Sequence, residues 1–348
     1  MEEGCSDSTQ GKHPVIKAVA LLSGGLDSRL AIKVVQDQGI DVYAANYVTC
    51  FCTCTGKNSC KSEARKACEQ LSVPLKVFAT SSEFIEVLKN PKHGYGKNMN
   101  PCIDCRILMF RKAKEYMEEI GASFLVTGEV LGQRPMSQRR DAMRLIDKEA
   151  GVEGLVLRPL SAKHLRVTIA EKEGWVDRET LLSITGRSRK EQMRLAETYD
   201  IRDYPCAAGG CLLTSEGFAN KVRDLLAHKD ADLNDMALLK VGRHFRLPGG
   251  GKAVVGKDKA QNLRILNLAR AGDIIFRPHN HLPVPTALLR DSDSEEDIVI
   301  TADLCISHSK LRTAPFILIE SYNYEAPSEI RIIKARAMPR ERINSLRI

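Results

Sequence analysis

Residues 15–28 read VIKAVALLSGGLDS, an apolar run followed directly by a glycine-rich turn. The apolar run predicts a buried strand, and apolar residues at helical spacing predict a helix over 28–38. Gly24 and Gly25 let a ligand approach the backbone closely, and the N–H groups and dipole of a helix N-terminus favour phosphate. The Ser28 hydroxyl is suited to cap that helix. The stretch therefore predicts a phosphate-binding turn between a strand and a helix.

Two familiar nucleotide-binding loops do not fit this turn. The loop of ordinary NTPases has a Lys after its glycines, and no Lys follows the glycines here. The turn also does not match the Gly-x-Gly-x-x-Gly of dinucleotide-binding folds. It resembles instead the PP-loop of the N-type ATP pyrophosphatases, which split ATP into AMP and pyrophosphate. This resemblance implies that the turn binds ATP with the help of Mg²⁺ and that Asp27 is needed for turnover. It also implies that the pyrophosphate part is held by the backbone and hydroxyls of Ser23, Gly24, Gly25, Leu26, Asp27 and Ser28.

The composition is typical of a soluble globular protein. The chain has 348 residues, enough for two domains, and is 43% hydrophobic and 28% charged. No apolar run approaches the ~20 residues of a membrane-spanning helix, and residues 1–14, an expected mobile lead-in, lack a signal-peptide pattern. We therefore expect a cytoplasmic protein without a membrane partner. The net charge of +8 permits a polyanionic partner without requiring one.

Strands alternate with helices over the first half of the chain, which predicts an α/β fold with a doubly wound, mostly parallel sheet. The resemblance to PP-loop enzymes implies an adenine nucleotide alpha hydrolase-like fold over 15–200. We expect strands over 15–22, 42–46, 75–78, 124–127 and 154–158. We expect helices over 28–38, 62–71, 83–88, 106–120, 163–173, 177–184 and 188–199.

The character of the sequence changes further along. Residues 201–234 predict a cysteine-bearing loop and a linker helix, with a domain boundary near 231–235. Over 241–256 apolar and polar residues alternate around a Pro-Gly-Gly-Gly turn, which is typical of a hairpin. We therefore expect a second, smaller α+β domain over 235–348. Its further strands are expected at 273–276, 297–300, 315–319 and 330–333.

The eleven cysteines indicate metal or redox chemistry rather than disulfides, if the protein is cytoplasmic. Cys102 and Cys105 form a Cys-x-x-Cys at a predicted loop-to-helix junction, where the helix dipole favours thiolates. The pair fits a redox couple or half of a zinc site. An earlier group fits either a zinc site or small apolar residues at a strand end, and both interpretations stay open for Cys50, Cys52, Cys54 and Cys60.

Further motifs resemble tRNA-thiolating enzymes. The segment 126–133, VTGEVLGQ, is similar to the segment after the fourth strand in tRNA 4-thiouridine synthetases, which implies that Gly128 lies at the ATP. The Arg-Pro-Leu at 158–160 resembles the segment that follows in that family. Residues 100–105, NPCIDC, resemble the motif before the long helix in tRNA 2-thiouridine synthetases.

Residues 102 and 105 of this motif are both cysteines. The same pair occurs in iron–sulfur-dependent tRNA thiolases, where a third cysteine lies far downstream. The resemblance implies a [4Fe–4S] cluster held by Cys102, Cys105 and Cys211, with Cys105 and Cys211 also catalytic. Three thiolates can hold such a cluster and leave one iron open for hydrosulfide. Cys206 competes with Cys211 as third ligand, but the two glycines before Cys211 favour it because they let the backbone approach a bulky cluster.

The second domain offers a resemblance of its own. Residues 242–257 contain Gly-Arg-His-Phe-Arg, Gly-Gly-Gly-Lys and Val-Val-Gly-Lys in succession. They look like a small RNA-binding domain found in ribosome quality-control proteins that bind tRNA. The alternative is a basic face that contacts only solvent. The resemblance implies RNA contacts from Arg243, Arg246, Lys252 and Lys257.

Together the motifs predict an ATP-dependent tRNA sulfurtransferase. It would adenylate a carbonyl oxygen of a base, release pyrophosphate and replace the oxygen by sulfur with the help of the iron–sulfur cluster. Its partners would be tRNA and a sulfur donor, either sulfide or a persulfide carrier, and a homodimer is compatible with the sequence. One alternative is a PP-loop enzyme that inserts sulfur into a small molecule or forms an amide. Another is a non-enzymatic RNA-binding or iron–sulfur protein.

Overall fold

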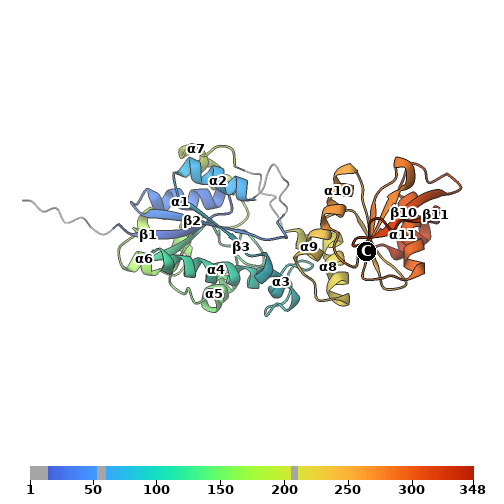
Figure 1. Ribbon diagram of the computed structural model, residues 1–348. Coiled ribbons are helices and arrows are strands. Elements are labelled where there is room, and N and C mark those ends of the chain that lie inside the picture. The colour runs from blue at the N-terminus through green and yellow to red at the C-terminus, as the bar shows by residue number, and fades with distance from the viewer. Residues whose placement is uncertain (1–14, 53–59, 205–210) are drawn as a thin grey trace, which may run out of the picture. The chain divides into compact units, whose positions relative to one another are not determined.

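The computed structural model of the protein describes residues 15–52, 60–204 and 211–348. The expected lead-in over 1–14, Cys54 and Cys206 lie outside the described residues, as does the side chain of Cys60. The chain forms two compact units, whose elements are labelled in Figure 1. Of the described residues, those within 15–96 and 100–211 form the first unit, and 97–99 with 212–348 form the second.

The first unit is built on a five-stranded sheet in which every pairing is parallel. Its strands are β1 (Lys17–Leu21), β2 (Asp41–Val48), β3 (Leu75–Ala79), β4 (Phe124–Thr127) and β5 (Val156–Leu157). Their order across the sheet is β3-β2-β1-β4-β5, which confirms the predicted doubly wound, parallel architecture. Because the order reverses between β1 and β4, the loops after these two strands flank a topological switch point, where ligands bind in such folds.

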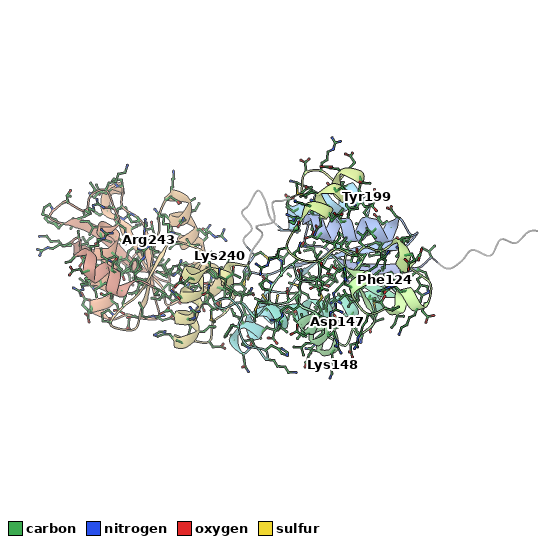
Figure 2. All side chains as sticks on the ribbon, turned by 180° about the vertical axis from the view of Figure 1, so that it is seen from behind. Phe124, Asp147, Lys148, Tyr199, Lys240 and Arg243 are labelled. Carbon is green, nitrogen blue, oxygen red and sulfur yellow. The ribbon has the colours of Figure 1, made fainter. Side chains whose placement is uncertain are left out.

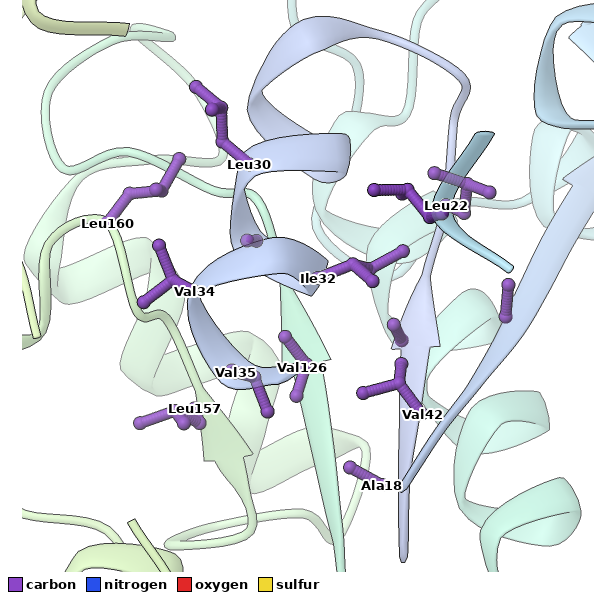
Figure 3. Packing of buried hydrophobic residues seen from close by; sticks show 14 of the residues in the cluster. Ala18, Leu22, Leu30, Ile32, Val34, Val35, Val42, Val126, Leu157 and Leu160 are labelled. Carbon is purple, nitrogen blue, oxygen red and sulfur yellow. The ribbon is translucent and has the colours of Figure 1, made fainter. Parts of the chain in front are cut away.

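Helices cover both faces of this sheet (Figure 1). They are α1 (Leu26–Gln36), α2 (Cys60–Leu71), α3 (Ser81–Lys89), α4 (Cys102–Glu119), α5 (Arg140–Glu149), α6 (Ile169–Lys172) and α7 (Lys190–Thr198), with 3₁₀ turns at Ala162–His164 and Arg178–Thr180. Figure 3 shows Ile32 and Val35 of α1 near Val126 of β4 and Leu157 of β5 in one apolar core. A second core lies beneath α4 and α5. Strand β1 supplies alternate residues to the two cores, so both faces of the sheet are buried.

Two of the three helices predicted after β5 are wrong. The range 163–173 contains only a 3₁₀ turn and the single-turn α6, because Thr168 forms a capping box with Glu171 in its middle. The range 177–184 holds a second 3₁₀ turn, after which the Leu182 N–H donates to the Pro159 carbonyl rather than continuing a helix. The third predicted helix forms as α7. Helix α5 was not predicted, since its few apolar residues lie among many charges.

The second unit contains a six-stranded antiparallel sheet of order β11-β10-β8-β9-β7-β6. The strands are β6 (Arg243–Arg246), β7 (Lys252–Val255), β8 (Ile274–Pro278), β9 (Ala287–Arg290), β10 (Ile317–Asn323) and β11 (Arg331–Ala335). The helices are α8 (Glu216–His228), α9 (Leu233–Leu238), α10 (Lys259–Leu268), α11 (Glu295–Ser307) and α12 (Arg340–Leu346), with 3₁₀ turns at Leu212–Thr214 and His279–His281. Strands β6 and β7 form the predicted hairpin. Helix α8, which we assigned to a linker before the boundary, lies in the second unit.

The predicted strand at 297–300 is wrong, because these residues belong to helix α11. The Ser294 hydroxyl accepts the N–H of Asp297 and caps the helix. Glu295, Glu296 and Asp297 fill the first turn, where negative charge suits the helix dipole. Helix α11 is buried on most of its surface, so it lacks the one-sided apolar pattern that distinguishes a surface helix from a strand.

Candidate active site

The SGGLDS loop, residues 23–28, connects β1 to α1 and turns sharply at Gly24, whose φ is +81°. Gly25 directly precedes the helix in an extended conformation, and its N–H donates to the Ser23 hydroxyl over 3.3 Å. The Ser28 hydroxyl donates to the Gly25 carbonyl over 2.9 Å and lies 3.3 Å from the Ser23 hydroxyl. Ser28 therefore lies within the first turn and is not the N-cap that the sequence suggested, because Gly25 occupies that position.

Two glycines allow close approaches around this loop. A Cβ on Gly24 would lie 2.9 Å from the backbone and side chain of Glu63 on α2. A Cβ on Gly128, the residue after β4, would lie 2.5 Å from the carbonyl of Asp27 and from the amide nitrogen of Ser28. The chain after β4 thus packs directly against the first turn of α1, at the switch point of the sheet. Gly128 shapes the loop through this contact.

Buried acceptor atoms without hydrogen-bond partners gather at the same edge of the sheet. One carboxylate oxygen of Asp27, Oδ2, accepts a hydrogen bond from Gln133 Nε2 over 3.1 Å. The other, Oδ1, is buried and has no partner within the described part of the chain. Asn46 on β2 donates to the Leu22 carbonyl over 2.7 Å, while its Oδ1 is also buried without a partner there. Buried acceptors are normally satisfied, so these two atoms are suited to a donor or cation supplied by a ligand.

Arg29 fixes the loop from behind. Its side chain is 1% exposed, and its Nε donates to the Gly24 carbonyl over 3.0 Å. Its Nη1 donates to Gln70 on α2 over 3.0 Å and to the carbonyl of Arg202 over 3.4 Å. Arg29 therefore connects the loop to α2 and to the chain shortly before Cys211. The sequence analysis did not single out this residue.

Three cysteine thiols of the first unit, those of Cys52, Cys102 and Cys211, lie within electrostatic range of Cys105. Cys102 is the first residue of α4 and Cys105 lies in its first turn, close to the predicted junction. Cys52 and Cys211 pair through an antiparallel backbone bridge. Burial raises the pKa of the Cys105 thiol to about 12, Arg106 opposes this shift, and the thiols of Cys211, Cys102 and Cys52 raise it further. The structure thus adds Cys52 to the three cysteines expected to act together.

The start of α4 was expected to stabilise thiolates, but the pKa values of its two cysteines are raised rather than lowered. Burial also raises the pKa of the Cys102 thiol, against the opposing effects of Arg106, Arg134 and a 2.8 Å hydrogen bond from Asn100. Desolvation disfavours the charged form of a thiol, and here it outweighs the favourable contacts. Within residues 15–52, 60–204 and 211–348, no three His, Cys, Asp or Glu side chains are arranged to hold a metal ion.

A buried ionic network joins the segment after β4 to helix α4. Glu129, which is 1% exposed, accepts a hydrogen bond from Arg158 Nε over 3.0 Å and lies 3.3 Å from Arg106 Nε. Arg158 also forms a bidentate pair with Asp147 of α5 over 2.8 and 2.7 Å. Figure 2 shows Asp147 within the body of the unit, whereas Lys148 lies at its rim. Burial disfavours the charged form of Arg158, but Glu129 and Asp147 outweigh this effect and raise the pKa of Arg158 above its usual value. The sequence analysis missed this network because its members come from four separate segments.

The residues expected to contact RNA in the second unit fall into two groups. Lys252 is 2% exposed and its Nζ lies 3.0 Å from Asp224. It is therefore not available for the RNA contact that the sequence analysis predicted. Arg246 forms a bidentate pair with the same carboxylate over 2.9 and 2.7 Å. Arg243 is half-buried and Lys257 is exposed, and neither has a carboxylate partner within the described residues. Figure 2 labels Arg243 on this unit.

No helix among the described residues is both long enough and apolar enough to span a membrane.

Comparisons with known proteins agree with the two units. Residues 13–174 match the family model of the thiamine biosynthesis protein ThiI, and residues 242–347 match that of the NFACT protein RNA-binding domain. Among curated proteins, the tRNA-specific 2-thiouridylase MnmA of Rippkaea orientalis is 26% identical over 242 residues, and that of Synechocystis sp. is 28% identical over 243 residues. Each match covers 66% of this chain, and the chain spans 64% and 63% of the length of these two relatives.

Solved structures give weaker similarities. A 4-thiouridine synthetase in complex with RNA and ATP is 21% identical, with 54% of this chain and 53% of that chain covered and a TM-score of 0.34. The U34-tRNA thiolase NcsA from Methanococcus maripaludis, solved with its [4Fe-4S] cluster, is 16% identical, with 64% and 80% covered and a TM-score of 0.32. These scores are too low to support an inference about function. The family matches coincide with the two sheets: residues 13–174, which match the ThiI family, contain the parallel sheet, and residues 242–347, which match the NFACT RNA-binding domain, contain the antiparallel sheet.

Proposed function

We propose that the protein is an ATP-dependent tRNA sulfurtransferase that forms a thiolated base. The observation that carries this proposal is the position of residues 128 and 129. Gly128 packs against the backbone of Asp27 in the SGGLDS loop, and the next residue, Glu129, lies 3.3 Å from Arg106, the neighbour of Cys105. One short segment therefore touches both the nucleotide loop and the cysteine-bearing helix, which suits a reaction that needs ATP and sulfur at one acceptor.

The SGGLDS loop would hold the pyrophosphate part of ATP. Backbone N–H groups at the start of α1 and the hydroxyls of Ser23 and Ser28 supply donors to phosphate oxygens. The buried Oδ1 of Asp27, which has no hydrogen-bond partner among the described residues, is a hard oxygen ligand of the kind that Mg²⁺ prefers. A magnesium ion there would orient the phosphates and offset the negative charge that builds up on the leaving group.

The chemistry follows from the need to remove a carbonyl oxygen. The carbonyl oxygen of a base would attack the α-phosphorus of ATP, and the bond from that phosphorus to the β-phosphate side would break with release of pyrophosphate. Sulfide would then attack the activated carbon, and AMP would leave with the original oxygen. Oxide is a far poorer leaving group than AMP, so adenylation supplies the driving force for the exchange.

Cys102, Cys105 and Cys211 would hold a [4Fe–4S] cluster. The donor set fits, because thiols are soft ligands and those of Cys102 and Cys211 both lie within electrostatic range of Cys105, although the three would have to draw closer to ligate iron. When bound, such a cluster supplies an open iron at which hydrosulfide can be held. Arg106, anchored by Glu129, would stabilise the negative charge of the ligating thiolates.

Replacing any one of these three cysteines by alanine is expected to reduce the iron and sulfide content by at least half after anaerobic reconstitution. Each substitution removes one of only three protein ligands to the cluster. The measurements are metal analysis, sulfide analysis and visible absorbance. The matched control is Cys305→Ala, a buried cysteine of α11 in the second unit.

Other outcomes would redirect or remove the cluster assignment. Cys206→Ala is expected to retain iron, and loss of iron there with full retention in Cys211→Ala would transfer the third ligand to Cys206. Loss in Cys52→Ala would add Cys52 to the ligands. One equivalent of zinc and no iron in the anaerobic wild-type protein would exclude the cluster.

The wild-type protein tests the proposed substrate. With ATP, Mg²⁺, sulfide and total tRNA, we expect a thiolated nucleoside by mass spectrometry together with AMP and pyrophosphate. Filter binding of total tRNA should weaken steeply with salt, since each neutralised phosphate in a duplex contributes about 0.9 to the slope of log affinity against log salt. Absence of both binding and thiolated nucleoside would instead favour an enzyme that acts on a small molecule.

A further inference from the structure

Four basic side chains gather in the second unit without a carboxylate partner. In the described part of the chain, no Asp or Glu oxygen lies within 4.0 Å of their charged nitrogens. By contrast, other arginines of the same unit form ion pairs with carboxylates, among them Arg246, Arg270, Arg277 and Arg290. We call this group the cation cluster. Its members are Lys221, Arg243, Lys257 and Arg347.

Backbone pairing brings three of these side chains to one edge of the sheet. Arg243 lies on β6, and its Nη1 donates to the carbonyl of Gly256 over 3.0 Å, directly beside Lys257. Arg347 is held against the same strand because its backbone forms an antiparallel bridge with Phe245. Strand β6, the segment after β7 and the residue after α12 therefore each contribute one cation.

The fourth cation comes from helix α8. Lys221 is half-buried, and its Nζ donates to the Leu239 carbonyl over 3.3 Å. Burial lowers the pKa of Lys221 to about 8, and the charges of Lys257, Lys252 and Arg347 lower it further. The pKa of Arg243 is lowered by burial and by Arg347. Lys257 and Arg347 thus repel Lys221, Arg347 also repels Arg243, and the native fold holds these cations together at an electrostatic cost.

The aspartate side chains nearby do not offset this charge. Asp224, one turn along α8 from Lys221, is already shared between Arg246 and Lys252. Asp258, next to Lys257, caps helix α10 by accepting the N–H of Gln261. Burial, Arg243 and Arg347 lower the pKa of His308 to about 4, so this ring is neutral at pH 7 and adds no further charge to the cluster. The excess positive charge is therefore left for an external anion.

We propose that the cation cluster binds consecutive phosphates of the RNA backbone. This inference rests on the proposed function, in which the acceptor is tRNA. Charge complementarity favours RNA, because several cations spaced over one surface match a polyanion better than a single anion. Lys221 lies outside residues 242–347, so the site extends beyond the segment that matches the RNA-binding family. Of the four residues predicted to contact RNA, the cluster keeps Arg243 and Lys257 and replaces the buried Lys252 and the paired Arg246.

The test compares three double variants of the full chain for binding of total tRNA across a series of salt concentrations. Lys257→Gln/Arg347→Gln removes two charges and is expected to weaken binding at least roughly tenfold and to reduce the salt slope by about 1.4–1.8. Lys257→Arg/Arg347→Lys keeps both charges and is expected to bind as the wild type does. The matched control is Lys310→Gln/Arg312→Gln, which removes two exposed charges elsewhere in the unit.

The result distinguishes this inference from the proposed function. One outcome is that the wild type binds and thiolates tRNA while Lys257→Gln/Arg347→Gln shows the same affinity and salt slope as the control Lys310→Gln/Arg312→Gln. In that case the cation cluster is not the RNA site and the proposed function stands. If the wild type shows no salt-dependent tRNA binding, both fall. Thermal unfolding of each variant separates a lost contact from a lost fold, because Lys257 and Arg347 both repel Lys221 and their neutralisation should not lower the melting temperature.

Discussion

Substituting alanine for Gly128 is expected to weaken ATP binding by at least tenfold and to destabilise the first unit by about 1–3 kcal/mol. The added Cβ would lie 2.5 Å from the Asp27 carbonyl and from the Ser28 amide nitrogen. Those atoms belong to the first turn of α1 and cannot rotate away as a side chain could. The segment after β4 would have to move away from the SGGLDS loop, and the loop would lose its shape.

The matched control is Gly217→Ala in helix α8, where an added Cβ meets nothing within 4 Å. Alanine is the better helix former, so this variant should be neutral or slightly stabilising. ATP binding by isothermal titration calorimetry and thermal unfolding together give the two effects. Wild-type ATP affinity in Gly128→Ala would show that the loop is not shaped by this contact.

The second large effect is expected for Asp27→Asn, which should lower the rate of ATP cleavage by about 100-fold or more. The substitution keeps the size of the side chain but removes the negative charge at the buried oxygen that has no partner in the described structure. Loss of a metal ligand or of charge stabilisation at a transferring phosphoryl group costs several kcal/mol of transition-state stabilisation. The protein should remain folded, since Gln133 can still contact the amide.

Asp37→Asn is the matched control, because Asp37 is the C-cap of the same helix α1 and pairs with Lys33 at the surface. It should keep the wild-type rate. Products are identified by chromatography of AMP, ADP, pyrophosphate and phosphate. Release of ADP and phosphate by the wild type would contradict cleavage between the α and β phosphates, and an unchanged rate in Asp27→Asn would remove this residue from the active site.

The sequence was sufficient to predict the features that depend on local pattern. The strand, glycine turn and helix over 15–38 follow from apolar periodicity and from the conformational freedom of Gly24. The parallel sheet follows from the alternation of strands and helices. Helix α11 was mistaken for a strand because a helix buried on most sides has no amphipathic period, although its Ser294 cap and acidic first turn were visible in the sequence.

Features that depend on long-range contacts could not be predicted in this way. Lys252 was expected on the surface because lysine usually is, but its position in β7 turns it toward Asp224 of α8. Glu129 acquires its role only when Arg106 and Arg158, from other segments, close around it. The raised pKa of Cys105 likewise reflects burial by the whole unit rather than its place at a helix N-terminus.

The pairing of β1 with β4 has a consequence for how the protein folds during synthesis. The SGGLDS loop is completed by Gly128, which is roughly a hundred residues further along the chain. At typical translation rates of about 5–20 residues per second, the ribosome needs roughly 5–20 seconds to make that stretch. During this time β1 has no neighbour on its β4 side, and the nascent chain presents an unpaired apolar edge. Chaperones that bind such edges would therefore act on this protein before it can bind its nucleotide.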